Sequence, residues 1–283
     1  MKLGVIGVGL IGGSFALGLK EFIPDLEVLG VDRNADNLTK AIELGVIDEI
    51  SDLESVCNQA DAIVLSIPVN AIKSVLPSLL DQVSENQLVV DFGSTKKAIC
   101  DAVKNHPNRA NFLAAHPIAG TEYSGPEAAF ADLFKQKVMI SCEEELTGKN
   151  QRTLFHELCA HFKMSMRQMT AEAHDLHLAF VSHLSHITSF ALSNTVLEKK
   201  DTEDHIFDMA GSGFASTVRL AKSSPDMWAP IFEENKSHLL EGLMSYIEQL
   251  QSFKTSLENG DESALKAFMG KANQIKEIVD RLE

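Results

Sequence analysis

The chain has 283 residues, 45% hydrophobic and 23% charged, with a formal net charge of −15. These proportions are ordinary for a globular protein of one or two domains with a sizeable core. The acidic excess argues against a general nucleic-acid binder, because no surplus of cations is available to neutralise phosphates. No apolar run approaches the roughly 18 residues that cross a bilayer, so we expect no membrane partner.

Two further features concern the compartment. The four cysteines, Cys57, Cys100, Cys142 and Cys159, are widely spaced and form no CxxC pair. This pattern is typical of reduced cysteines that contribute to packing. The N-terminus enters a strand-like run after one lysine, without the pattern of a cleaved signal peptide. We therefore expect a cytoplasmic protein.

The first 165 or so residues alternate β-branched runs with amphipathic segments. The predicted strands are Lys2–Ile6, Glu27–Val31, Ala62–Ile67, Leu88–Asp91, Phe112–Ala115 and Val138–Ser141. The helix-like segments between them include Ile11–Lys20, Asn34–Leu44, Ala71–Leu80 and Lys96–Lys104. Such alternation predicts an α/β domain over residues 1–168, with a Rossmann-like, doubly wound, mostly parallel sheet covered by helices on both faces.

Helical spacing dominates residues 169–283, which we expect to form an all-helical domain. The predicted elements are a helix at Thr170–Leu197, a loop containing Gly211 and Gly213, a helical run from Ser224-Pro225 toward Leu257, and an amphipathic helix at 262–282. Ser224 supplies a hydroxyl for the helix N-cap, and Pro225 suits the first turn.

The helical part holds more apolar residues than a small domain needs to cover. They include Leu239, Leu240, Leu243, Ile247 and Leu250. Surplus apolar surface of this kind is typical of an interface between subunits. We expect a homodimer through the helical domain, with intramolecular packing alone as the alternative.

Gly7, Gly9 and Gly12 form a GxGxxG motif between the first predicted strand and helix. Gly7 permits a tight turn, Gly9 lets a pyrophosphate approach the backbone, and Gly12 lets the helix pack against the strand. The first helical turn, with Leu10 and Ile11, would bind the pyrophosphate through exposed N–H groups. A glycine-rich turn without a ligand is the alternative.

An acidic residue and a second strand end complete the predicted dinucleotide site. Asp32 ends the second strand, 20 residues past Gly12, where its carboxylate would accept from ribose hydroxyls. The same charge would repel a 2′-phosphate, which favours NAD over NADP, although Arg33 could pair with such a phosphate. Ser66, Ile67 and Pro68 end another strand and would lie beside the cofactor at the carboxyl edge of the sheet.

Two more strand ends carry candidate catalytic groups. Ser94 lies between a predicted strand and helix, where its hydroxyl could serve the reaction or simply cap the helix. His116 directly follows the strand Phe112–Ala115 and precedes a proline. A histidine at this edge would face the nicotinamide side and could move a proton near neutral pH. We expect His116 to be catalytic, with a structural role as the alternative.

His183 and His186 are three residues apart and share one face of the long predicted helix. Asp175 lies about three turns earlier on the same stripe, whereas His174 falls opposite to His183. The pair could pack, face solvent, bind a metal or face a substrate. Because neither a cysteine nor a second ligand pair lies nearby, we predict no metal site.

Six segments together resemble one family. They are Gly7–Gly13, Asp91–Lys96, His116–Gly125, Ala128 to Phe134, His174 to His186, and Arg219 to Trp228. These segments look like those of prephenate/arogenate dehydrogenases, and the resemblance covers essentially the whole chain. Two positions depart from the family pattern. Ser185 stands where a proline is usual between the histidines, and Ala215-Ser216 stands where Arg-Asp is common.

The resemblance implies NAD-dependent oxidative decarboxylation of prephenate to 4-hydroxyphenylpyruvate in tyrosine biosynthesis. It implies that His116 accepts the proton of the 4-hydroxyl and that Ser94 orients this hydroxyl. Arg219 would clamp a substrate carboxylate with its paired donors. The other implied substrate-binding residues are Thr121, Glu122, His183 and His186, with Glu122 pairing with Arg219 or gating access.

Other functions stay open at this point. Arogenate differs from prephenate by an amino group in place of a keto group. A β-hydroxyacid dehydrogenase would need a catalytic lysine inside Thr170–Leu197, which has none, and pyrroline-carboxylate reductases lack the His116–Glu122 segment. A scaffold that binds NAD without turnover would not need Ser94, His116 and Arg219 together.

Overall fold

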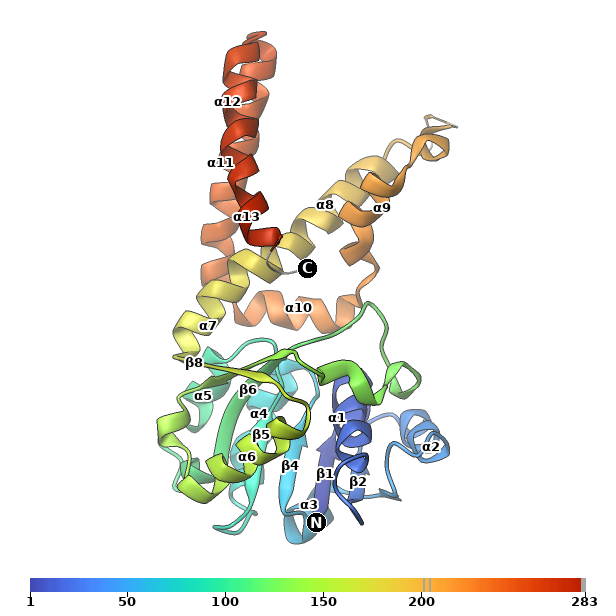
Figure 1. Cartoon of the computed structure of the whole chain (residues 1–283), viewed down its shortest axis with the longest axis vertical. Coiled ribbons are helices and arrows are strands. Elements are labelled where there is room, and N and C mark those ends of the chain that lie inside the picture. The colour runs from blue at the N-terminus through green and yellow to red at the C-terminus, as the bar shows by residue number, and fades with distance from the viewer. Residues whose placement is uncertain (201, 204, 281–283) are drawn as a thin grey trace. The chain divides into compact units, whose positions relative to one another are not determined.

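The computed structural model describes residues 1–200, 202–203 and 205–280. They form two compact units, Met1–Lys236 and Ser237–Glu283. The first unit contains an eight-stranded sheet in the order β3-β2-β1-β4-β5-β6-β7-β8 (Figure 1). The strands are β1 (Lys2–Ile6), β2 (Glu27–Val31), β3 (Glu49–Ile50), β4 (Ala62–Leu65), β5 (Leu88–Asp91), β6 (Phe112–Ile118), β7 (Val138–Cys142) and β8 (Ser165–Met169).

The sheet is mostly parallel, as predicted. Only the β6–β7 pair among these strands is antiparallel. All six predicted strands are present, while β3 and β8 were not predicted. Both residues of β3 are exposed, and β8 has no fully buried residue. Neither strand therefore shows the apolar run by which strands are predicted from sequence. Strand β6 runs on to Ile118, so His116 lies inside the strand rather than after it.

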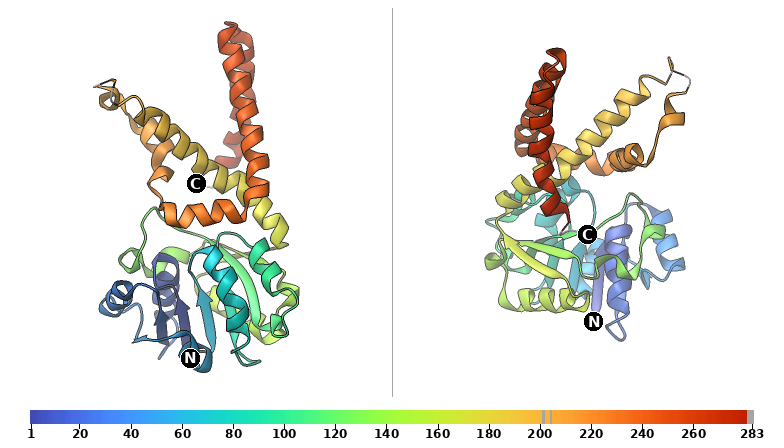
Figure 2. Two further views of the ribbon diagram at one scale, coloured as in Figure 1. Left: turned by 180° about the vertical axis from the view of Figure 1, so that it is seen from behind. Right: turned by 45° about the horizontal axis from the view of Figure 1, so that its top comes forward.

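Helices cover both faces of the sheet, as Figure 2 shows from two further sides. One apolar cluster joins the sheet to α1 (Leu10–Lys20), α2 (Ala35–Glu43) and α6 (Lys149–His161). The other joins it to α3 (Leu53–Gln59), α4 (Val69–Leu80) and α5 (Lys97–Val103). Neighbouring strand residues such as Ile63 and Val64 belong to opposite clusters, because successive side chains in a strand point to opposite faces. The doubly wound α/β prediction is confirmed, and α3 and α6 add to the helices that were named from the sequence.

The long helix predicted at Thr170–Leu197 is continuous but not uniform. It consists of α7 (Ala171–Leu178), the π-helical turn η5 (Ala179–His183) and α8 (Leu184–Leu197). A π-turn holds one extra residue, which shifts everything after it by about 100° around the axis. The α-helical spacing that put His174 opposite His183 therefore does not apply, and both side chains are buried.

The predicted run from Ser224 toward Leu257 is two helices. Helix α10 (Pro225–Glu234) is followed by Asn235 and then α11 (Lys236–Glu258). Pro225 starts α10 as expected, but the Ser224 hydroxyl makes no capping hydrogen bond. The loop predicted around two glycines is partly helical as well, since α9 covers Ser212–Val218 and the 3-10 turn η7 covers Arg219–Lys222.

The second unit is helical throughout the part that the structure describes. After α11 come α12 (Glu262–Ala272), the 3-10 turn η8 (Asn273–Ile275) and α13 (Lys276–Val279). The helix predicted at 262–282 is thus present in three pieces, while residues 281 and 282 lie outside the described residues. Within 1–200, 202–203 and 205–280, no helix is both long and apolar enough to cross a membrane.

Candidate active site

The glycine-rich turn between β1 and α1 depends on the absence of side chains. Gly7 has a φ of +96°, and a Cβ there would lie 2.6 Å from the carbonyl oxygen of Ser66. A Cβ on Gly12 would lie 2.3 Å from the carbonyl oxygen of Gly7. A Cβ on Gly9 would meet only the Gly125 nitrogen, at 3.9 Å. The turn and packing roles of Gly7 and Gly12 are confirmed, while the ligand role of Gly9 stays a prediction.

Helix α1 begins without a side-chain cap. Its N-cap is Gly9, and its first turn contains no acidic residue. The N–H groups of Leu10, Ile11 and Gly12 precede the first intrahelical hydrogen bonds and have no acceptor within the described residues. Together with the helix dipole, such groups form a site for an anionic group.

The other predicted cofactor residues surround this turn. Asp32 directly follows β2, and its two carboxylate oxygens accept from the N–H groups of Val8, at 3.2 Å, and Asn34, at 2.9 Å. The Ser66 hydroxyl donates to the Gly7 carbonyl at 2.7 Å, so it supports the turn. The remaining predicted residues are Ile67, whose Cγ2 faces Gly7, Pro68, which precedes α4, and the exposed Arg33.

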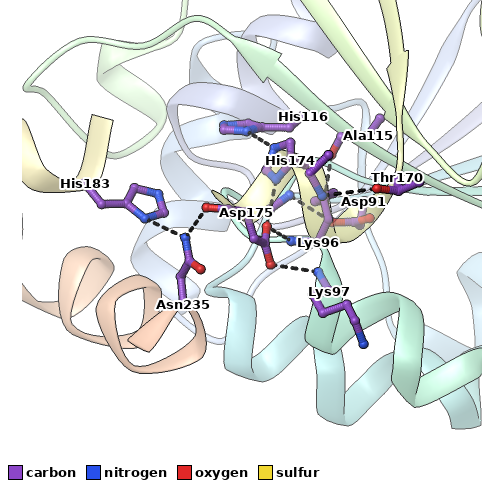
Figure 3. Close-up of polar contacts among 12 residues, drawn as sticks. Asp91, Lys96, Lys97, Ala115, His116, Thr170, His174, Asp175, His183 and Asn235 are labelled. Atoms are coloured by element: carbon purple, nitrogen blue, oxygen red, sulfur yellow. Dashed lines mark hydrogen bonds and ion pairs between the residues drawn. The ribbon is translucent and has the colours of Figure 1, made fainter. Parts of the chain in front are cut away.

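A chain of hydrogen bonds lies at the carboxyl end of β6 (Figure 3). Nδ1 of His116 lies 2.9 Å from Nε2 of His174 in α7. Nδ1 of His174 lies 2.7 Å from Oδ1 of Asp175. His174 is fully buried, whereas His116 is half-buried and its Nε2 has no partner in the described chain. The helical spacing put His174 opposite His183, and the structure brings it into contact with His116.

Asp175 also caps α5. Its carboxylate accepts from the backbone N–H groups of Lys96, at 2.7 Å, and Lys97, at 2.9 Å. The alternative in which Ser94 caps this helix is therefore wrong. The Ser94 hydroxyl is half-buried and has no hydrogen-bond partner among the described residues. It remains available to a ligand.

A buried cation lies beneath the histidines. Lys96 has no exposed surface, and its ammonium binds the Asp91 carboxylate and the Ala115 carbonyl, the latter at 2.7 Å. Burial, His174 and Lys96 together hold the pKa of His116 well below its ordinary value of 6.5. His116 is therefore neutral at pH 7 and has a lone pair with which to accept a proton.

Asn235, at the break between α10 and α11, orients a second histidine. Its Nδ2 donates to the carbonyl oxygen of Asp175 at 2.7 Å and lies 3.1 Å from Nδ1 of His183 (Figure 3). Since an amide nitrogen only donates, Nδ1 of His183 accepts and the ring hydrogen sits on Nε2. Burial lowers the pKa of His183 to about 4. Its Nε2 is buried without a partner in the described chain, so a ligand acceptor there would satisfy a costly unpaired donor.

His186 connects the histidines to the predicted carboxylate clamp. Its ring stacks on Trp228 with centroids 3.5 Å apart, and its Nδ1 hydrogen-bonds the Ser182 carbonyl at 3.0 Å. Burial lowers the pKa of His186, and the positive charge of Arg219 lowers it further. Arg219 and Glu122 form an ion pair at 3.8 Å, so their predicted pairing is confirmed.

Thr121 lies on the surface, apart from the hydrogen bonds of the histidines. It is exposed and accepts from the Tyr123 N–H at 3.2 Å. It lines a surface cavity of about 680 Å³ together with Ile118 and Phe130. No interaction within the described residues joins Thr121 to the histidines.

Two family models match the chain almost end to end. Residues 15–166 match the nucleotide-binding domain of prephenate dehydrogenase, and residues 170–271 match its dimerization domain. The chain belongs to the prephenate dehydrogenase family. The two models meet near residue 168, the predicted domain limit, whereas the two compact units divide after Lys236, so this limit stays a prediction.

Individual members of the family are similar over their length. A prephenate dehydrogenase of Bacillus subtilis is 30% identical over 96% of this chain and 74% of its own. A cyclohexadienyl dehydrogenase of Zymomonas mobilis is 30% identical over 92% of this chain and 89% of its own. The structure of prephenate dehydrogenase from A. aeolicus with hydroxyphenyl propionate and NAD+ is 29% identical, with a TM-score of 0.89 over 99% and 98% of the two chains. The Synechocystis arogenate dehydrogenase structure is 28% identical, with a TM-score of 0.78 over 99% and 100%.

The departures from the usual family pattern lie away from these hydrogen bonds. Ser185 is exposed just after the π-turn, and Ala215 and Ser216 are exposed in α9. Asn235 and the buried Lys96 were not predicted to take part; the partners of Asn235, Asp175 and His183, lie 60 and 52 residues earlier in the chain. Among the described residues, no group of three or more His, Cys, Asp or Glu could hold a metal ion.

Proposed function

We propose that this protein is an NAD-dependent prephenate dehydrogenase, which makes 4-hydroxyphenylpyruvate and CO2 in tyrosine biosynthesis. The observation that carries the proposal is the place of His116. This neutral histidine lies at the same carboxyl edge of the parallel strands as the glycine turn, with its Nε2 unoccupied by any described residue. Ligands of doubly wound sheets bind at this edge. The relatives named prephenate dehydrogenase support the choice of reaction.

The turn after β1 fits a dinucleotide. The free N–H groups of Leu10, Ile11 and Gly12 would bind the pyrophosphate, and Gly9 leaves room for it. The Asp32 carboxylate keeps lone pairs for ribose hydroxyls and would repel a 2′-phosphate. When bound, NAD supplies the hydride acceptor. The A. aeolicus structure, which contains NAD+, supports this cofactor.

The protein's own part in the reaction is to move one proton. His116 accepts the proton of the substrate 4-hydroxyl while hydride leaves C4, the ring carbon that carries this hydroxyl. The C–CO2 bond then breaks, its electron pair enters the ring, and His116 returns the proton to the oxygen of the aromatic product. The free hydroxyl of Ser94 supports a role in orienting the substrate hydroxyl. Formation of the aromatic ring drives the overall reaction.

The other predicted substrate-binding residues would bind a dianion. Prephenate carries a ring carboxylate and a side-chain carboxylate. Arg219 offers a half-exposed guanidinium whose ion pair with Glu122 is long, so it can bind a carboxylate with paired donors. Nε2–H of His183, which has no partner in the described chain, and the ring of His186 would contact the rest of the substrate.

Arogenate is a second candidate substrate. The cyclohexadienyl dehydrogenase of Zymomonas mobilis and the Synechocystis arogenate dehydrogenase, at 30% and 28% sequence identity, are about as close to this chain in sequence as the prephenate enzymes. The two substrates share the ring and its 4-hydroxyl, so the same proton transfer serves both.

A homodimer through the helical domain is part of the proposal. The match to a dimerization domain supports it, as do the exposed apolar side chains of α11, which include Leu240, Met244, Ile247 and Leu250. Multi-angle light scattering would test it, and a monomer at micromolar concentration would contradict it. The cytoplasmic location stays a prediction.

Steady-state kinetics with both substrates and both nicotinamide cofactors test the function. We expect NADH formation and CO2 release with prephenate and NAD, and a lower kcat/KM with arogenate or NADP. Saturable NAD binding without turnover of either cyclohexadienol would instead indicate a binding protein.

A further inference from the structure

Two buried residues, His174 and Asp175, lie behind His116 in the protein interior. His174 has no exposed surface, and Asp175 has almost none. The Asp175 carboxylate lies 2.7 Å from His174, and the far nitrogen of His174 lies 2.9 Å from His116 (Figure 3). The three side chains form a line from the protein interior to the proposed base.

The direction of each hydrogen bond follows from the ends of this line. The N–H groups of Lys96 and Lys97 donate to the Asp175 carboxylate. Burial alone would raise the pKa of Asp175, but these hydrogen bonds and that from His174 hold it below its ordinary value. Asp175 is therefore an ionised carboxylate that can only accept. It follows that Nδ1 of His174 carries a hydrogen.

The second hydrogen bond is then determined as well. Burial lowers the pKa of His174 and outweighs the opposing effect of Asp175, so the ring is neutral. A neutral ring with a hydrogen on Nδ1 has a lone pair on Nε2. That lone pair faces Nδ1 of His116. The contact is a hydrogen bond only if Nδ1 of His116 donates.

We propose that His174, held by Asp175, is a positioning residue that fixes His116 in the tautomer with hydrogen on Nδ1 and a lone pair on Nε2. The inference rests on the proposed function, because the 4-hydroxyl proton is what Nε2 would take. When the substrate O–H bond breaks, the N–H bond forms at Nε2 and His116 becomes a cation. Its Nδ1–H then donates more strongly to His174, and the Asp175 charge stabilises the cation without taking a proton. A carboxylate holds a catalytic imidazole in this way in serine proteases.

The arrangement differs from a carboxylate placed directly against the base. A neutral ring separates Asp175 from His116, so the pKa of His116 stays low while its orientation is fixed. Lys96, beneath the strand, opposes protonation further. The site thus combines a fixed lone pair with a base that is unprotonated at neutral pH.

Nitrogen-15 NMR of histidine-labelled protein tests the tautomer directly. Protonated and unprotonated imidazole nitrogens resonate in separate regions, and the His116→Asn variant identifies the signals of residue 116. We expect the hydrogen of His116 on Nδ1 in the free enzyme. A hydrogen on Nε2, or a mixture of both tautomers, would overturn the inference. This measurement needs neither turnover nor a folded His174 variant.

Kinetics of two His174 variants form the second arm. His174→Gln can place an amide oxygen near the position of Nε2 and keep an acceptor for His116, whereas His174→Leu keeps bulk without one. We expect His174→Leu to lower kcat by about 10²-fold or more with little change in KM, since loss of a tautomer-fixing partner can cost about 10⁴-fold in a protease. His174→Gln should stay within roughly tenfold of wild type.

His177 supplies the matched control, because it is exposed on the same helix. His177→Leu and His177→Gln should both turn over like wild type. Wild-type kcat in His174→Leu would sink the inference and leave the proposed function standing. Absence of turnover in the wild-type enzyme would sink the proposed function, while the tautomer result would still be decided by NMR.

Discussion

The two halves of the site are built in different ways. The proposed dinucleotide half is one continuous turn, in which free backbone N–H groups face a space that glycines leave open. The histidine half is assembled from β6, α5, α7, the π-turn and the residue after α10, and side-chain hydrogen bonds join these elements. Changes in the first half should therefore act through fit and backbone geometry, and changes in the second through protons and charge.

His116→Asn should separate the two halves most sharply. Loss of a general base typically lowers kcat by about 10²–10⁴-fold, while the affinity for NAD should hardly change because the turn after β1 is untouched. Stopped-flow turnover and NAD titration measure the two quantities. His205→Asn is the control, since His205 is 84% exposed. Turnover at the wild-type rate would remove His116 from the mechanism.

Arg219→Ala tests the charge of the histidine half. A hydrogen-bonded charge contact is worth about 1.5–3 kcal/mol, which corresponds to a rise of roughly 10–10²-fold in KM for prephenate with a smaller change in kcat. Lys222→Ala, an exposed cation on the same 3-10 turn, should leave KM unchanged. An unchanged KM in Arg219→Ala would assign the clamp to another residue.

The pH dependence of kcat/KM tests the electrostatics around His116. Its pKa lies well below 6.5, mainly through burial, so the neutral form persists as the pH falls past that value. We expect kcat/KM to stay level through pH 6.5 and to fall tenfold per pH unit only below the lowered pKa. A limb centred at or above pH 6.5 would show that His116 is solvated like a free imidazole.

Gly12→Ala tests the dinucleotide half by fit alone. The added Cβ would lie 2.2 Å from the Ser66 hydroxyl and 2.3 Å from the Gly7 carbonyl. Overpacking of this kind costs about 1–3 kcal/mol, so we expect a lower free energy of unfolding and weaker NAD binding. Gly213→Ala, where nothing lies within 4 Å, is the control. Equal unfolding curves for the two variants would show that the turn can relax.

The sequence predicted the turn between β1 and α1 because the determinants of the turn are local. Three glycines between a strand and a helix predict the turn by their spacing alone, and Asp32 follows 20 residues after the last of them. The place of His116 near a strand end was predicted for the same reason, although β6 is longer than the apolar run that predicted it.

The rest of the histidine half could not be read from spacing. His174 was put on the wrong side because an α-helical period was applied across a π-turn, and the sequence carries no clear mark of that turn. Asn235 was overlooked because apolar residues continue past it, so that α10 and α11 resembled one helix. Ser94 was given a capping alternative because nothing in the sequence shows that Asp175, about 80 residues later, occupies the cap.

Asn235→Ala should have the smallest effect of these changes and the most informative one. It removes both donors, so Asp175 loses a partner for its carbonyl and His183 is free to move its hydrogen from Nε2 to Nδ1. Loss of one neutral hydrogen bond is worth about 1 kcal/mol, which corresponds to a rise in KM of roughly five- to tenfold. Asn235→Asp, of nearly equal volume, cannot donate to either group and should raise KM at least as much.

Asn194→Ala in α8 is a suitable control, and the free energy of unfolding should be measured alongside KM. A lower free energy of unfolding with unchanged KM would mean that Asn235 has only a structural role, in holding α7 and the π-turn to the end of α10. A rise in KM in both variants, with kcat nearly constant, would show that His183 meets the substrate as a donor. His174 and His183 would then have different roles because of their different links to Asp175. The Asp175 carboxylate accepts directly from His174, whereas the Asp175 carbonyl is joined to His183 through Asn235.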